Sequence, residues 1–168
     1  EVSWDCSDNF ETVHTNKITH DYNIAGTYDI CVRSLSPLAF YAPDLATDEK
    51  AKLQEIKQWG SIKWSNFTRA FQGMKNMQLT ATDVPNLSQV TDMTATFEGA
   101  TSFTGHESMQ NWDVSNVNRM LITFRDTPNF NAPISSWITT NVTNMSGLFQ
   151  NASAFNQPIG GWDTRKVI

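Results

Sequence analysis

The chain has 168 residues, a formal net charge of −5 and 39% hydrophobic residues, enough for one domain or for a small domain joined to a short repeat array. It has no run of 18 apolar residues and no stripe of basic residues, which excludes a membrane-spanning helix and argues against nucleic acid and anionic membranes as partners. The chain opens at Glu1 without a signal peptide and stops at Ile168 inside a repeating pattern, so we expect it to be cut from a longer protein.

Charge and aromatic residues divide the chain into two differently built parts. Residues 1–58 carry ten acidic and five basic side chains, whereas residues 59–168 carry seven of each. All three Tyr lie before position 42, while all six Met, eight of the ten Phe and five of the six Trp lie from Trp59 onward. We therefore predict a boundary between a part covering 1–46 and a part covering 47–168.

Residues 1–46 are predicted to form a small β element. Tyr28–Val32 alternates apolar and polar residues after an Ala-Gly turn signal, which is typical of a strand. The stretch Ile18–Tyr28 resembles the last hairpin of a polycystic-kidney-disease-type (PKD) β-sandwich. Val2–Asp5 is similar to an earlier strand, although Asp-Cys-Ser-Asp stands where that family has a glycine-rich turn. A full sandwich has roughly 100 residues, so the resemblance implies a partial one, which we expect to shield the first repeat.

Two cysteines, Cys6 and Cys31, fall on two predicted neighbouring strands of this element. In an extracellular chain they would form a disulfide, and the alternative is a pair of buried thiols. Asp5, Asp8 and Glu11 could supply oxygen ligands to calcium, with solvation of a loop as the alternative. No histidine metal site is predicted, because the histidines are isolated in the sequence. They are His14, His20 and His106.

From Trp59 onward, apolar residues recur at intervals of 25 to 27 residues in five columns that share one phase. A period of this length is typical of a supersecondary unit stacked on its neighbours. The columns are Phe71, Phe97, Phe124 and Phe149; Phe67, Met93, Met120 and Met145; Met77, Phe103, Phe130 and Phe155; Trp112, Trp137 and Trp162; and Val117, Val142 and Val167.

Each repeat predicts a short helix followed by a short strand. Met145, Leu148 and Phe149 lie at i, i+3 and i+4, which places them on one face of a helix. Trp112–Ser115 alternates apolar and polar residues, as a short strand does. The expected helix N-caps are Ser65, Thr91, Asn118 and Thr143, and the expected left-handed helix ends are Gly73, Gly99, Asp126 and Asn151. The predicted fold class is an α/β repeat solenoid with stacked parallel strands, capped by the N-terminal β element.

The repeat resembles that of BspA-type bacterial leucine-rich-repeat surface proteins over roughly residues 53–168. The stretches that carry the resemblance are Phe149–Thr164, Trp112–Met120 and Asn141–Met145. The resemblance implies a leucine-rich-repeat-like solenoid displayed outside the cell, with large aromatics in a column that leucines fill in simpler repeats. Residues 53–64 are expected to start the array.

No catalytic motif is present, so we predict that the protein is not an enzyme and uses no cofactor. A nucleophile elbow, a phosphate-binding loop, a dinucleotide fingerprint and a C-x-x-C pair are all missing. Five Asn-x-Ser/Thr sequons occur, but the repeat itself uses Asn, Ser and Thr in caps and turns, so we assign them no modification. They begin at Asn66, Asn86, Asn141, Asn144 and Asn151.

The leading functional hypothesis is an extracellular or cell-surface binding module for adhesion or protein–protein interaction. What the BspA-type resemblance implies is a partner on a host or neighbouring cell, or in the matrix. One alternative is a passive structural spacer. Another, suggested by the PKD-like strands, is a carbohydrate-binding accessory module of a secreted enzyme. The aromatic residues lie almost entirely in the core columns, which counts against the glycan alternative.

One departure from the repeat suggests a binding site. Ile138 follows its Trp at the position where the neighbouring repeats have Asp113 and Asp163. If this position faces outward, the middle repeat presents an apolar side chain flanked by carboxylates, and an apolar centre with a polar rim is a recognised form of contact site. The alternative is that Ile138 turns inward because its repeat is distorted.

Overall fold

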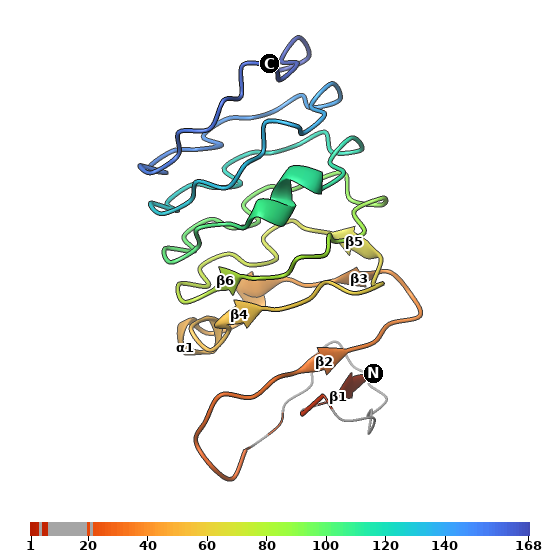
Figure 1. Ribbon diagram of the computed structural model, residues 1–168, viewed down its shortest axis with the longest axis vertical. Helices are drawn as coiled ribbons and strands as arrows, with labels where there is room; N and C mark the ends of the chain where they lie inside the picture. Colours follow the sequence, from red (N-terminus) through yellow and green to blue (C-terminus); the bar gives the residue numbers. More distant parts are fainter. Residues whose placement is uncertain (4, 7–19, 21) are drawn as a thin grey trace. The chain divides into compact units, whose positions relative to one another are not determined.

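A computed structural model describes residues 1–3, 5–6, 20 and 22–168. Most of these residues lie in turns and irregular segments, linked by very short regular elements (Figure 1). The strands are β1 (Val2–Ser3), β2 (Cys31–Val32), β3 (Leu38–Ala39), β4 (Glu55–Ile56), β5 (Trp64–Asn66) and β6 (Gln78–Leu79). The helices are the 3₁₀ turn η1 (Ala42–Asp44), α1 (Thr47–Lys50) and the 3₁₀ turn η2 (Glu107–Asn111). None of the described helices is both long and apolar enough to cross a membrane.

The chain forms two compact units, unit 1 (Glu1–Ser36) and unit 2 (Pro37–Ile168), so the boundary lies ten residues before the predicted one at 46/47. In unit 1, β1 pairs antiparallel with β2, with Val2 opposite Val32 and Ser3 opposite Cys31. The predicted strand at Tyr28–Val32 is thus present only in its last two residues. The predicted hairpin at Ile18–Tyr28 lies partly outside the described residues.

The predicted α/β repeat solenoid of leucine-rich-repeat type is wrong. No repeat contains the expected short helix, since α1 is the one α-helix among the described residues and precedes the repeats. The strands of unit 2 form just two two-stranded parallel sheets, β3 with β5 and β4 with β6. The predicted N-terminal β element that caps the solenoid is wrong as part of that fold class. The described part of unit 1 has only two strands of two residues each.

Backbone conformation explains why the helices do not form. Each predicted helix contains, two residues after its first apolar residue, a residue with positive φ: Arg69 (56°), Ala95 (55°), Ile122 (51°) or Gly147 (62°). A residue in the left-handed region cannot continue a right-handed helix. The apolar stripe therefore belongs to a chain of tight turns that places Met, Thr and Phe side chains inward.

Four segments of similar path follow one another in unit 2, and we call them tiers 1 to 4. They cover residues 66–91, 92–118, 119–143 and 144–168. Backbone hydrogen bonds join neighbouring tiers in parallel, for example from Met120 N–H to the Asn144 oxygen (2.8 Å), and parallel bridges pair Asp92 with Arg119 and Arg119 with Asn144. Figure 1 shows these segments lying side by side from yellow to blue.

The core of unit 2 is built from the predicted aromatic columns. Rings of Phe71, Phe97, Phe124 and Phe149 stack face to face, with successive centroids 5.5, 5.6 and 5.7 Å apart, which confirms that they form one column. The first three are buried, and Phe149 is half-buried. A second stack joins Phe103, Phe130 and Phe155, and a third joins Trp112, Trp137 and Trp162. Burial of this many rings is the main source of stability available to unit 2.

Turn chemistry at the start of tiers 1, 2 and 4 differs from the predicted caps by one residue, and in tier 3 the predicted cap Asn118 is followed by Arg119, which forms no such turn. Asn66, Asp92 and Asn144, rather than Ser65, Thr91 and Thr143, accept a hydrogen bond from the backbone N–H two residues on, at 2.7, 2.7 and 2.9 Å. These are Asx turns, and the same bond occurs at helix N-termini, so it is the positive φ in the following residues that prevents a helix. The predicted left-handed positions are correct, with φ of 73°, 69°, 56° and 61° at Gly73, Gly99, Asp126 and Asn151.

Candidate interaction surface

The three residues predicted as a binding site occupy one exposed column across tiers 2, 3 and 4. The Asn141 amide donates to the Ser115 oxygen (2.8 Å), and the Thr139 hydroxyl donates to the Asp163 oxygen (3.1 Å), so the segments that follow each Trp lie next to one another. Ile138 is 56% exposed, Asp113 is exposed and Asp163 is half-buried. Ile138 therefore faces outward and does not turn into the core.

The neighbours of Ile138 use their carboxylates to form turns. Asp113 Oδ1 accepts bonds from the Ser115 N–H (3.1 Å) and hydroxyl (2.6 Å). These two bonds hold the pKa of the Asp113 carboxyl below its ordinary value. Asp163 accepts from the Arg165 backbone and guanidinium, with Nη2 at 2.6 Å, and the Arg165 side-chain bonds lower the pKa of Asp163 to about 2. Both groups are carboxylates at neutral pH.

Asn86 belongs to the same column, and the sequence reasoning missed it. Its side-chain oxygen accepts bonds from the Ser88 N–H (3.2 Å) and hydroxyl (2.7 Å), the same arrangement that Asp113 makes with Ser115. The available signal was the likeness of Asn-Leu-Ser at 86–88 to Asp-Val-Ser at 113–115. The complete column reads Asn86, Asp113, Ile138, Asp163, and Ile138 is its one member that cannot accept a hydrogen bond through its side chain.

Buried anchors hold Ile138 in place. The preceding Trp137 stacks between Trp112 and Trp162 at 6.3 and 6.2 Å, and its indole N–H donates to the Met109 oxygen (2.7 Å). The following Thr139 is buried. The exposed aliphatic side chain is thus presented from a backbone fixed on both sides, which limits the entropy lost when a partner binds.

Amide side chains cross-link the tiers beside this column. Asn116 donates to the Ser88 oxygen (3.2 Å), and Lys166 Nζ donates to Asn141 Oδ1 (3.0 Å), which continues the ladder that Asn141 makes with Ser115. Residues 127–162 contain no charged side chain at all. The surroundings of Ile138 are therefore mostly neutral and polar, with the carboxylate of Asp113 on one side and the Asp163–Arg165 ion pair on the other.

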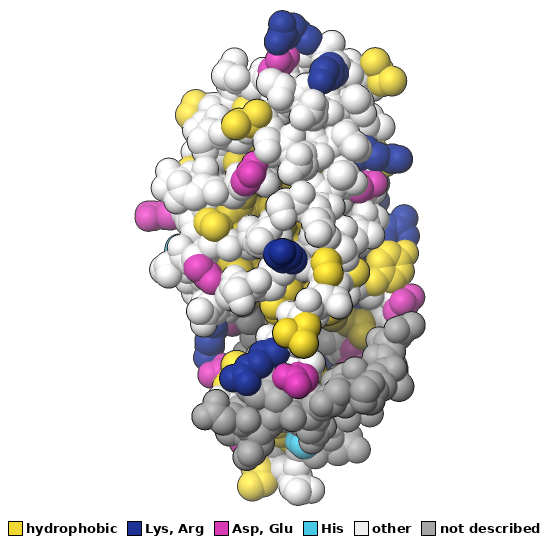
Figure 2. All heavy atoms as spheres, turned by 90° about the vertical axis from the view of Figure 1, so that its right-hand side faces the viewer, with side chains coloured by type: hydrophobic (Ala, Val, Ile, Leu, Met, Phe, Trp, Pro, Cys, Tyr) yellow, Lys and Arg dark blue, Asp and Glu magenta, His cyan; other side chains and the backbone are white. Residues whose placement is uncertain are grey.

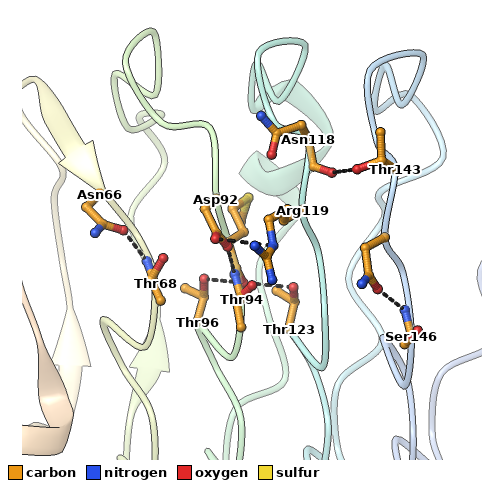
Figure 3. A network of polar contacts seen from close by, with 12 residues as sticks. Asn66, Thr68, Asp92, Thr94, Thr96, Asn118, Arg119, Thr123, Thr143 and Ser146 are labelled. Carbon is orange, nitrogen blue, oxygen red and sulfur yellow. Dashed lines mark hydrogen bonds and ion pairs between the residues drawn. The ribbon is translucent and has the colours of Figure 1, made fainter. Parts of the chain in front are cut away.

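A second polar column lies at the start of the tiers (Figure 3). In place of an Asx-forming residue, tier 3 has Arg119, whose Nε lies 3.6 Å from Asp92 Oδ2 in a partly exposed ion pair. Beneath it, the buried hydroxyls of Thr96 and Thr123 both donate to the Met93 oxygen, at 2.8 and 2.9 Å. These contacts satisfy polar groups of the stack itself, and exposed pairs of this kind contribute little energy.

A third cluster is closed by its own contacts. The buried Glu98 forms an ion pair with Arg125 through one carboxylate oxygen and accepts from the Gln72 amide through the other (2.6 Å). Both oxygens of Glu98 are therefore occupied by groups from the adjacent tiers. The cluster ties tiers 1, 2 and 3 together and leaves the carboxylate no free oxygen for chemistry.

The surface seen from the side of β5 shows no large field of one sign (Figure 2). On this face, acidic, basic and apolar side chains of the described residues are scattered among uncharged ones. Long-range electrostatic attraction requires charge of one sign to accumulate, and this face has no such accumulation.

The remaining predicted residues lie elsewhere. The structure joins Cys6 and Cys31 in a disulfide within unit 1, with Cα atoms 5.0 Å apart. His106 accepts from the Ser108 N–H (3.1 Å), and the ring of His20 packs edge-on against Tyr22, whereas His14, Asp8 and Glu11 lie outside the described residues. No group of three or more potential metal ligands occurs among the described residues.

Comparison with known proteins gives one match. The family model described as "Mycoplasma protein of unknown function, DUF285" matches residues 49–168, which include all four tiers. No curated protein and no solved structure matches the chain.

Proposed function

This chain belongs to the DUF285 family, and from that premise we propose that it is an extracellular or cell-surface binding module that contacts a macromolecular partner through the column around Ile138. The partner is a surface protein of a host or neighbouring cell, or a matrix component. In this proposal the chain catalyses no reaction and uses no cofactor. The resemblance of the repeat to BspA-type surface proteins and the Cys6–Cys31 disulfide support a location outside the reducing cytoplasm.

The single observation that carries the proposal is the exposure of Ile138. An isolated exposed aliphatic residue is ordinary, but this one replaces an Asx-turn residue in an otherwise polar column and sits on a backbone anchored by Trp137 and Thr139. The flanking Asp113 and Asp163 give it a polar rim. An apolar centre on a rigid support with a hydrogen-bonding rim is the arrangement that concentrates binding energy at protein interfaces.

The test compares three forms of the protein on immobilised matrix proteins, with collagen, fibronectin and laminin as probes, and on intact host cells. Ile138→Asp restores the pattern of the neighbouring tiers and should bind at least about tenfold more weakly than wild type. Thr101→Asp adds the same charge at an exposed position of another turn and should bind as wild type does. Both variants should unfold within about 0.5 kcal/mol of wild type, since neither side chain is buried.

Two outcomes would reject this function. If wild type bound none of these surfaces at about 50 µM, well above the dissociation constants of ordinary interactions, the passive spacer would be the better account. If Thr101→Asp weakened binding as much as Ile138→Asp, added negative charge rather than loss of the apolar centre would explain the effect, and the contact site would lie elsewhere.

A further inference from the structure

The two carboxylates that flank Ile138 differ in the oxygens that remain free for a partner. Asp163 uses both of its oxygens inside its own turn. The Arg165 backbone N–H and Nε donate to Oδ1, at 3.1 and 2.9 Å, and Nη2 donates to Oδ2 at 2.6 Å. Because one guanidinium spans both oxygens, the charge of Asp163 is balanced within its own tier. A partner that approached this carboxylate would have to displace Arg165.

Asp113 is bound through one oxygen only. The Ser115 N–H and hydroxyl both donate to Oδ1, at 3.1 and 2.6 Å, so both lone pairs of that oxygen are used. Within the part of the chain that the structure describes, Oδ2 has no hydrogen-bond or ion-pair partner. The two bonds from Ser115 lower the pKa of Asp113, whereas Arg165 and Lys166 both contribute to the lowered pKa of Asp163. Asp113 is therefore an exposed carboxylate with one free oxygen and no paired cation.

The stretch of sequence around Asp113 supplies no cation. Residues 76–118 carry five acidic side chains and neither lysine nor arginine. Three of the five are occupied by other parts of the chain. Asp92 and Glu98 pair with arginines of tier 3, and Asp83 accepts from two backbone N–H groups at 2.8–3.1 Å. Asp113 is thus left without a counter-ion from its own chain, directly beside the exposed Ile138 column.

We propose that the partner places a lysine against Asp113, with its ammonium group on Oδ2, next to an apolar side chain that packs on Ile138. The inference rests on the proposed function and gives the two flanking acids different roles. Asp113 contacts the partner, whereas Asp163 holds its own turn. The segments that carry Asp113 and Ile138 lie in adjacent tiers and are joined by the bond from the Asn141 amide to the Ser115 oxygen (2.8 Å). The lysine and the apolar residue are therefore neighbours on the surface of the partner.

The free oxygen count decides between lysine and arginine. A guanidinium pairs best with a carboxylate through two parallel bonds, one to each oxygen. Asp163 shows that arrangement with Arg165 in the same column. At Asp113 one oxygen is already filled by Ser115, so an arginine would leave a donor without its acceptor. An ammonium group is a point charge and can be satisfied by a single oxygen.

Other ligands fit this position less well. A sulfated glycan or an acidic peptide would bring like charge against Asp113, which disfavours binding. A divalent cation such as calcium takes six or more oxygen ligands. No group of three or more potential metal ligands occurs among the described residues. A lysine-bearing protein surface meets both the charge and the geometry.

The test uses the full chain on immobilised collagen, fibronectin and laminin, each before and after chemical modification. Acetylation removes the positive charge of the lysines on these probes and should weaken binding at least about threefold. Phenylglyoxal modifies arginines instead and should weaken binding less than acetylation does. Because the probe is modified and the chain is not, the fold of the chain is not at risk.

Two variants of the chain remove one negative charge each. Asp113→Asn should keep its turn, because Asn86 makes the same two bonds with Ser88 in tier 1. It should bind the untreated probes at least about threefold more weakly, depend less on salt, and lose nothing further when the probe is acetylated. Asp163→Asn changes the net charge equally and should bind as wild type does, since its carboxylate does not meet the partner.

Three outcomes would overturn the inference. Equal losses for Asp113→Asn and Asp163→Asn would show that net charge, and not a contact at one carboxylate, weakens binding. Unchanged or tighter binding by folded Asp113→Asn would show that no cation meets Asp113. A larger effect of phenylglyoxal than of acetylation would show that the cation is not a lysine. In each case Ile138→Asp still tests the proposed function separately, whereas a wild type that binds none of the probes rejects both.

Discussion

The inner and outer columns of unit 2 follow different rules. Inside, each tier places the same kinds of residue in the same column, so Phe97, Phe124 and Phe149 stack ring on ring. Outside, one column changes from Asn86 to Asp113 to Ile138 to Asp163, while hydrogen bonds still join the neighbouring segments that carry it. The comparison teaches that the stack constrains the interior chemistry and leaves the exposed positions free to vary, as a binding surface requires.

The largest effect is expected for Phe124→Ala, which tests whether the stacked aromatic rings in the interior stabilise unit 2. Its buried ring contacts Phe97, Phe130 and Phe149, so truncation should lower the free energy of unfolding by about 3–5 kcal/mol. Phe149→Ala is the matched variant, and it should cost clearly less because Phe149 is only half-buried. Urea unfolding followed by tryptophan fluorescence measures both. An equal loss of unfolding free energy in the two variants would contradict the difference in burial between Phe124 and Phe149.

The disulfide of unit 1 offers a contrast with the aromatic stack. Cys6 and Cys31 are 25 residues apart, and a loop of that size corresponds to about 2–4 kcal/mol of stabilisation. The unreduced protein should be two hydrogen atoms lighter by mass spectrometry. Reduction, or Cys6→Ser with Cys31→Ser, should release the pairing of β1 with β2 and leave the unfolding of the tiers unchanged. Two thiols titrating in the freshly isolated folded protein would contradict the disulfide.

Backbone strain at the exposed Arg69 should have a smaller effect on the free energy of unfolding. Arg69 is exposed and has a φ of 56°, a conformation that costs a non-glycine residue energy. Arg69→Gly should therefore leave stability unchanged or raise it, while Lys75→Gly, at an exposed position of the same tier without positive φ, should lower it. The expected difference between the two variants is roughly 1–2 kcal/mol by thermal unfolding. A larger loss for Arg69→Gly would show that the left-handed turn is not the cause.

The carboxylates of the outer column should differ in their titration. The Arg165 partner keeps the pKa of Asp163 at about 2, so this exposed ion pair is present above the ordinary carboxyl pKa and is lost as the pH falls from about 4 to about 2. Arg165→Gln should raise the pKa of Asp163. Ser115→Ala should raise that of Asp113, which is lowered by the bonds to Ser115. Carbon-detected NMR titration follows both groups, and an ordinary pKa for Asp163 in wild type would contradict the pairing.

The sequence predicts which aromatic rings stack on one another better than it predicts the backbone conformation within each tier. Equal spacing of Phe71, Phe97, Phe124 and Phe149 was enough to place the rings in one column, because only a repeated backbone path brings such residues into register. The apolar i, i+3, i+4 pattern predicted helices that are absent. Periodicity reports which side chains face inward, but it does not report that Ile122 adopts positive φ, which residues of its type rarely do.

The candidate surface was predicted in part. The change from Asp to Ile at position 138 is visible in the sequence, which left open whether the side chain faces outward or inward; only its exposure in the structure shows that it faces outward. The Asx turns of Asn86 and Asp113 were not predicted, because a carboxamide or carboxylate in a turn is read equally well as simple solvation.

The most direct measurement of the central claim is hydrogen exchange on the complex of the full chain with whichever matrix protein or cell-surface protein it binds. The account predicts slower exchange in the segments that carry the outer column, at 113–116, 138–141 and 163–166, and no change in the turns at 101–104 and 128–131 on other parts of the tiers. Protection confined to those other turns, or to unit 1, would contradict the claim that the partner is recognised through the column around Ile138.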